Sequence, residues 1–125
     1  MKSGAQVVIS ARRDNMLVSV AKECEKFGLK PVVLPLDVTV ATQAKEAYDS
    51  IIAKYGRIDS VVLNAGRSQR NLAVDTSLDE TKELLELNFI SYVALTKLVL
   101  PSMIERKSGQ VSIVMITWKY HAFTI

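Results

Sequence analysis

The sequence predicts an α/β protein with a doubly wound parallel sheet. Short apolar runs alternate with longer helix-forming segments along the 125 residues, in the order strand, helix, strand, helix, strand, helix, strand. The clearest run covers residues 58–66, where Val and Leu lead into Asn64-Ala65-Gly66 and a helix-forming segment lies on each side. A strand buried on both faces of a parallel sheet has this continuous apolar character.

The first half of the chain divides at its glycines and prolines. We expect a strand over residues 6–11 and then a helix that begins at Asp14 or Asn15 as N-cap and runs to about Phe27. The next strand is expected over residues 30–37, where Pro35 favours an edge position because proline cannot donate to the ladder. A further helix should begin at Thr39 as cap. It should run to Tyr55 and end at Gly56.

The second half contains one long helix. A polar loop is expected over residues 67–76, after which Ser77 and Asp79 announce a helix over residues 78–106. Pro101 should bend this helix or divide its last turn from the rest. Gly109 should stop it, and the last strand is expected over residues 110–117.

Composition excludes several classes of protein. The net charge of +3 is spread along the chain, which gives little support to nucleic-acid binding. Cys24 is the only cysteine, so no intrachain disulfide forms, and with His121 as the only histidine no zinc site is expected. Cys24 shares a helical stripe with apolar residues and is predicted to be a buried structural thiol. No apolar run is long enough to span a bilayer, so the chain as written is expected to be soluble.

The candidate ligand site lies at Asn64-Ala65-Gly66, because ligands of open α/β sheets bind beyond the carboxyl ends of the strands. An ordinary turn explains the same residues equally well. The five glycines all fall between the expected elements, and no phosphate-cradling glycine loop is present.

Together, these residues resemble a known family. Asp37-Val38 after one strand, Asn64-Ala65-Gly66 after the next and Asn88 within Leu-Glu-Leu-Asn-Phe-Ile match the order and spacing of the classical short-chain dehydrogenases/reductases. The resemblance covers residues 6–114 of a single domain over 1–125 and leaves 115–125 as a divergent tail. The sequence of residues 68–79 is similar to that of the branch called dehydrogenase/reductase family member 7.

The resemblance implies a fold and a cofactor. The fold is a partial Rossmann-like doubly wound parallel sheet that lacks the first strand and the C-terminal half. Without the first strand, the remaining strands should form two pairs with no central partner. Arg12, with Arg13 next to it, matches the position that meets the adenosine 2′-phosphate in the family, which implies NADP(H) rather than NAD(H). Two arginines that merely solvate a strand end are the alternative.

The same resemblance assigns the other site residues. Asp37 matches the contact to the adenine amine, and Val38 packs near the ring, although Asp37 could equally be a turn residue. Asn64-Ala65-Gly66 matches most of the family's Asn-Asn-Ala-Gly signature, with Leu63 in place of the first asparagine. Asn88 matches the catalytic asparagine whose backbone carbonyl holds a water, and a buried structural asparagine is the alternative.

The tail departs from the family. Ile116 stands at the position of the catalytic serine, and Lys119-Tyr120 has the right residue types for the Tyr-x-x-x-Lys pair in the wrong order and spacing. We therefore expect a fragment or truncated isoform of an NADP(H)-dependent oxidoreductase acting on a hydroxyl or carbonyl substrate. As given, it should be inactive and marginally stable. It would be cytosolic as written, or associated with the endoplasmic reticulum if the complete protein carries an N-terminal anchor.

Two other classes of function share features with this sequence. A non-catalytic module could pair with a full-length homologue, or with a second copy, through the helix over residues 78–106. Its apolar positions are Leu84, Leu87, Tyr92, Leu95, Leu98 and Val99. The simpler alternative is that these residues pack on the sheet. A receiver-type signalling domain is excluded because Arg12-Arg13 supplies positive charge where such domains need an acidic pair for Mg²⁺.

Overall fold

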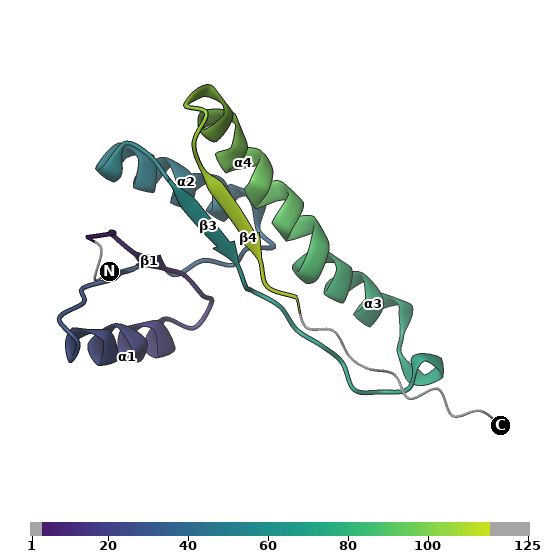
Figure 1. Ribbon diagram of the computed structural model, residues 1–125. Coiled ribbons are helices and arrows are strands. Elements are labelled where there is room, and N and C mark those ends of the chain that lie inside the picture. The colour runs from purple at the N-terminus through teal and green to yellow at the C-terminus, as the bar shows by residue number, and fades with distance from the viewer. Residues whose placement is uncertain (1–3, 116–125) are drawn as a thin grey trace.

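The computed structural model describes residues 4–115 and confirms the alternation of strands and helices (Figure 1). The elements in order are β1 (Val8–Ile9), α1 (Asp14–Glu25), β2 (Val32–Val33), α2 (Ala41–Tyr55), β3 (Ser60–Leu63), the 3-10 turn η1 (Ala73–Asp75), α3 (Leu78–Leu85), the π-helical turn η2 (Glu86–Ile90), α4 (Ser91–Glu105) and β4 (Gln110–Ile113).

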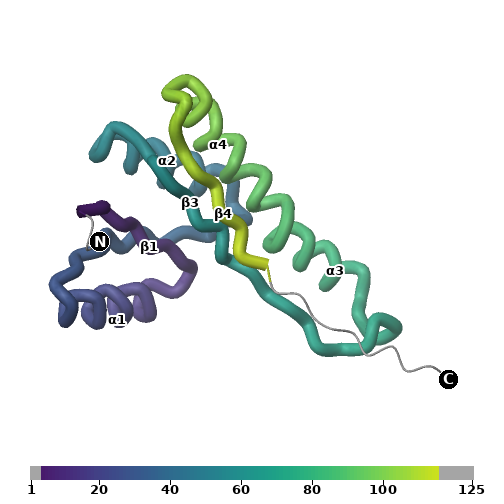
Figure 2. The backbone as a smooth tube through the Cα atoms, viewed as in Figure 1, coloured from purple at the N-terminus to yellow at the C-terminus, as the bar shows by residue number. Residues whose placement is uncertain are grey.

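The four strands form two separate parallel pairs, as expected for a sheet without its central strand. β1 pairs with β2 in the register Val8 to Val32, and β3 pairs with β4 in the register Ser60 to Gln110. Figure 2 shows the two pairs side by side, with α1 beside the first pair and α4 along β4. A small apolar cavity of about 110 Å³ lies between the pairs, lined from one side by Leu34 and from the other by Val61. The core is therefore divided rather than continuous.

Strand lengths and burial differ from the prediction. β1 and β2 are two residues each, although backbone hydrogen bonds continue the pairing as far as Leu36 N to Ala11 O at 3.1 Å. A strand with a partner on one side only has fewer bonds to keep it regular, which explains the shortening. The prediction that β3 is buried on both faces is wrong, because Val62 is 63% exposed whereas Leu63 is buried.

Two helix ends were predicted correctly and two were not. Ser77 Oγ accepts from Glu80 N at 3.1 Å and caps α3, and Gly56 ends α2 in the left-handed region with φ 78°. Asp14 and Asn15 do not cap α1, whose N-cap is Arg13, and Thr39 does not cap α2, whose N-cap is Val40. The Thr39 hydroxyl is already committed to Asp37.

The buried thiol predicted at Cys24 is also wrong. Cys24 is half-buried, and Phe27 on the same stripe is 80% exposed. Only Leu17 on α1 is buried. The helix has an apolar stripe, but the β1–β2 pair is too narrow to cover the whole of it.

The long helix is interrupted in its middle rather than at its proline. The π-helical turn Glu86–Ile90 separates α3 from α4, and α4 continues through Pro101. Turns of this kind are often found at functional sites, and this one contains Asn88. By length and composition alone, Leu78–Glu105 is apolar enough to cross a membrane, contrary to the expectation from the sequence; about 28% of its most apolar window is buried within the protein.

None of the six apolar positions predicted for pairing is exposed. Leu87, Tyr92 and Val99 are buried, and the other three predicted positions are half-buried. A different set of large apolar side chains on this helix is exposed: Leu78, Leu85, Phe89, Ile90, Val93, Leu100 and Ile104.

Candidate functional site

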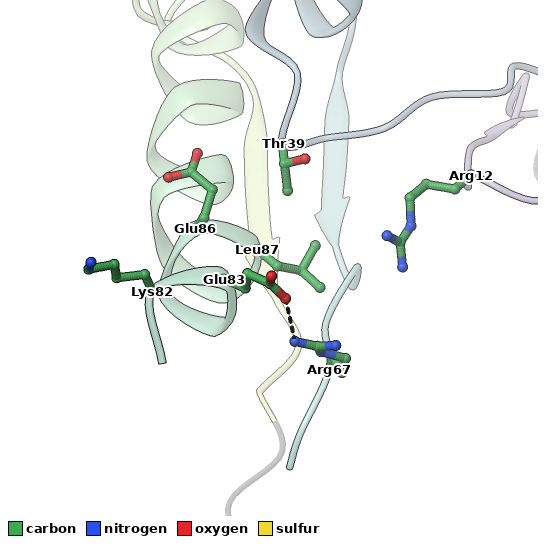
Figure 3. A pocket seen from close by; sticks show the side chains of 7 residues that line it. All are labelled: Arg12, Thr39, Arg67, Lys82, Glu83, Glu86 and Leu87. Carbon is green, nitrogen blue, oxygen red and sulfur yellow. Dashed lines mark hydrogen bonds and ion pairs between the residues drawn. The ribbon is translucent and has the colours of Figure 1, made fainter. Parts of the chain in front are cut away.

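A cavity of about 440 Å³ opens beyond the carboxyl ends of β1 and β3 (Figure 3). Seven residues from four segments line it, namely Arg12, Thr39, Arg67, Lys82, Glu83, Glu86 and Leu87. Arg12 follows β1, Thr39 follows β2, Arg67 follows β3, and the remaining four come from α3 and the π-helical turn. Parallel strands carry their following loops to one edge of the sheet, which is why residues so far apart in sequence meet here.

Arg12 supplies positive charge to one side of the cavity. Its guanidinium reaches inward from the turn after β1 (Figure 3). Within residues 4–115 it forms no ion pair. An arginine with no carboxylate within ion-pair distance keeps its bidentate donors available for an incoming anion.

Asp37 lies next to the Arg12 side of the cavity, and its hydrogen bonds favour the ionised carboxylate. Its Oδ1 accepts from the Thr39 hydroxyl at 2.7 Å and from Thr39 N at 3.0 Å. The hydroxyl bond is the largest cause of a lowered Asp37 pKa, followed by the backbone bond. Partial burial opposes the shift, and the positive charge of Arg12 adds to it. Asp37 is therefore an ionised hydrogen-bond acceptor at neutral pH.

Asn88 fixes the loop that follows β3. Its Oδ1 accepts from Arg67 N at 3.0 Å, and its Nδ2 donates to Arg67 O at 2.7 Å. Gly66 makes room for this contact, because a Cβ built there would lie 3.2 Å from Asn88 Oδ1. The side chain is exposed rather than buried, so the interpretation of Asn88 as a buried structural asparagine is wrong.

Arg67 itself closes the far side of the cavity. Its Nη2 lies 3.2 Å from Glu83 Oε2, an ion pair that joins the loop after β3 to α3 (Figure 3). Both side chains are substantially exposed, at 48% and 71%. The cavity thus has an unpaired arginine on one side and a charge-neutralised arginine on another.

The structure gathers some of the predicted residues around the cavity and leaves others beside it. Arg12 lines it directly, and Asp37 and Gly66 each lie next to a lining residue. Arg13 is exposed at the start of α1 and does not line the cavity. The same holds for Val38, which is half-buried, and for Asn64 and Ala65, which are exposed beyond β3.

Sequence reasoning missed Arg67 and Glu83. Arg67 directly follows Gly66, so its place at the strand end could have been predicted. Glu83 is one of several acidic residues on its helix, and no sequence signal distinguishes it from Glu80 or Glu86.

This arrangement, with site residues after successive parallel strands, agrees with comparisons against known proteins. The sequence pattern of the short chain dehydrogenase family matches residues 1–118. The chain belongs to this family.

Among its curated relatives is dehydrogenase/reductase SDR family member 7 of Mus musculus, which is 46% identical over 114 residues. The aligned region is 88% of this chain and 34% of the mouse protein, and the Homo sapiens protein matches with the same figures. A member 7-like protein of Drosophila melanogaster is 32% identical, again over 88% of this chain. The chain therefore spans about a third of the length of these relatives.

Solved structures give the same fold. A short-chain dehydrogenase from Streptomyces avermitilis is 32% identical with a TM-score of 0.80, covering 90% of this chain and 40% of that one. A gluconate 5-dehydrogenase from Burkholderia cenocepacia, solved with NADP and tartrate, is 26% identical with a TM-score of 0.77 over 90% of this chain and 44% of that one. The partial Rossmann-like fold of this family member is thereby shown.

Proposed function

We propose that this chain is the adenosine-binding part of an NADP(H)-dependent short-chain oxidoreductase, a truncated form that does not complete turnover by itself. The observation that carries the proposal is Arg12, whose guanidinium faces the cavity with no ion-pair partner within residues 4–115. A planar guanidinium suits a 2′-phosphate, and an acidic residue at this position would favour a free 2′-hydroxyl instead.

The neighbouring residues fit the rest of an adenosine. Arg13 offers a second, exposed cation at the start of α1. The bonds from Thr39 use Oδ1 of Asp37, so Oδ2 is the acceptor for the adenine amine, and half-buried Val38 supplies apolar surface near the ring. The backbone of Asn64, Ala65 and Gly66 lies beyond β3, where a ligand of an open sheet approaches.

Asn88 has a structural contact through its side chain, whose two polar atoms bind Arg67. We assign the catalytic water that the family places at this position to the backbone carbonyl of Asn88. The π-helical turn around it is the local feature that supports this role.

Turnover needs groups that the sequence does not contain in the family arrangement. Ile116 stands where the family has its serine, and no Tyr-x-x-x-Lys occurs among the 125 residues. The tyrosine and lysine exchange the substrate proton while the bound cofactor supplies or accepts hydride. A chain without them retains part of the cofactor site without the proton-transfer site. The complete protein would act on the hydroxyl or carbonyl of a small molecule.

The test compares the binding of NADPH and NADH by calorimetry. We expect the chain to prefer NADPH, and the variant R12M to lose that preference by roughly tenfold, because one charge-assisted contact is removed. Arg57→Met is the matched control, since this exposed arginine pairs with Asp59 at the other end of β3. Equal affinities in the parent chain, or NADPH-dependent reduction of a ketone or quinone by it, would contradict the proposal.

A second candidate function is pairing with a full-length homologue through the long helix. The exposed apolar side chains named above support it, and Phe89, 59% exposed, lies near the middle of the helix. If pairing occurs, the chain should co-purify with an intact homologue, and Phe89→Glu should abolish this. Phe27→Glu should not, although Phe27 is 80% exposed on α1. Loss in both variants, or in neither, would count against the helix as the interface.

A further inference from the structure

We propose that Arg67 is a base-contacting residue, whose guanidinium plane forms one wall of the slot for the adenine ring. The inference rests on the proposed function, since it concerns the same cavity. It adds a residue beyond the family motifs, and it assigns different tasks to the two arginines of the cavity.

Two independent contacts fix Arg67. Asn88 binds its backbone at both N and O, and Glu83 holds its guanidinium at 3.2 Å. A side chain restrained at its base and at its tip loses little further freedom when a ligand arrives, which lowers the entropic cost of binding. Arg67 is thus better prepared to meet a flat ligand than an unpaired surface arginine would be.

Charge separates the role of Arg67 from that of Arg12. Glu83 neutralises Arg67, and Glu86 and Lys82 add one charge of each sign, so that this side of the cavity carries no net charge. A phosphate placed there would meet no net attraction, whereas an uncharged ring needs none. Arg12 has no such partner within residues 4–115. The phosphate therefore belongs at Arg12 and the base at Arg67.

The lining between the two arginines suits a ring. Leu87 supplies an apolar surface on the helix side, and Thr39 lies across the cavity from the Arg67–Glu83 pair (Figure 3). Lys82 also lines the cavity, but its ammonium group is paired with Asp79 at 3.2 Å and lies apart from Arg67 in the same view. Guanidinium groups stack on aromatic faces through their planar, weakly hydrated surface, and an ammonium group does this less well.

The test titrates the 125-residue chain with adenosine and with adenosine 2′-monophosphate. Arg67→Met should weaken the binding of both probes by roughly threefold to fivefold, and the ratio of the two affinities should stay unchanged. Arg67→Lys keeps the charge without the plane and should weaken both probes similarly. Arg57→Lys, at an exposed arginine whose ion pair with Asp59 lies outside the cavity, should leave both affinities as they are.

Unchanged adenosine binding in both Arg67 variants would overturn the inference, and so would a loss confined to the 2′-phosphate probe, which would make Arg67 a phosphate ligand. Equal binding of both probes by the parent chain would refute the preference for NADP(H). If the Arg67 variants still weakened the binding of both probes, the role of Arg67 would be supported all the same. Failure of the parent chain to bind either probe would overturn both. Matching circular dichroism spectra show that the exposed substitutions leave the fold intact.

Discussion

Asn88 holds the backbone of Arg67 at both ends, with Oδ1 3.0 Å from its amide nitrogen and Nδ2 2.7 Å from its carbonyl oxygen. The contact joins the π-helical turn to the loop after β3 across 21 residues of sequence. It fixes the position of the loop from which Arg67 reaches the cavity.

Asn88→Ala should lower the free energy of unfolding by about 1–2 kcal/mol, because two hydrogen bonds are lost. Amide hydrogen exchange at Arg67 should accelerate more than exchange in β4. Asn71→Ala, a change at an exposed asparagine in the same loop, should have no comparable effect. If Arg67 exchange is the same in all three proteins, the two bonds do not fix the loop in solution.

Gly66→Ala should cost about 1 kcal/mol, since the new Cβ would lie 3.2 Å from Asn88 Oδ1 and force the clamp apart. In the Asn88→Ala background the same change should cost markedly less, because the group that it displaces is gone. Urea unfolding of the two single variants and the double variant measures this coupling. Additive costs would show that Gly66 is required for some other reason.

Thr39→Val should raise the pKa of Asp37 toward its ordinary value, because the hydroxyl bond is the main cause of the lowered pKa. Because the pKa of Asp37 is lower in the folded protein than in the unfolded chain, the ionised carboxylate stabilises the fold at pH values above the unfolded pKa. This contribution is lost as the pH falls through the folded pKa. The variant should therefore be less stable than the parent chain near neutral pH, and the difference should shrink in acid. A carboxyl carbon NMR titration measures the pKa, with Thr76→Val, whose hydroxyl donates to a backbone carbonyl, as control. An unshifted Asp37 would contradict the assignment.

The divided sheet should make the chain self-associate, because β1 and β3 each have one edge without a strand partner within residues 4–115. Sedimentation velocity should show larger species as concentration rises. Val62→Lys, which places a charge on β3, should reduce them. Val74→Lys, at a position 86% exposed in the 3-10 turn, is the matched control. If both variants self-associate to the same extent, the contact between copies of the chain does not involve β3.

The sequence was enough to predict the elements, because these depend on short-range patterns, and the resemblance to the family implied how the strands pair. The apolar runs located all four strands, and Gly56 and Ser77 correctly marked helix ends. Strand length and burial could not be predicted in the same way. Val62 lies in an apolar run that is usual for a buried strand, yet its exposure depends on what packs above it.

The site was predicted in part for the same reason. Gly66 and Asn88 stand out as motifs, but the sequence does not show that Asn88 binds the residue after Gly66. Thr39 was predicted to be a helix cap, and only the fold shows that its hydroxyl binds Asp37 instead. Contacts between loops that follow different strands are set by tertiary packing, and local sequence propensity does not predict them.

The most direct test of the adenosine site is a nitrogen-15 NMR titration of the chain with adenosine 2′-monophosphate, followed residue by residue. The proposed function predicts that the amide signals of Arg12, Thr39 and Arg67 shift together along one saturable curve, and that those of Arg57 and Lys107 do not move. Shifts that centre on residues outside the cavity, or that do not saturate, would contradict the placement of the nucleotide at this edge of the sheet.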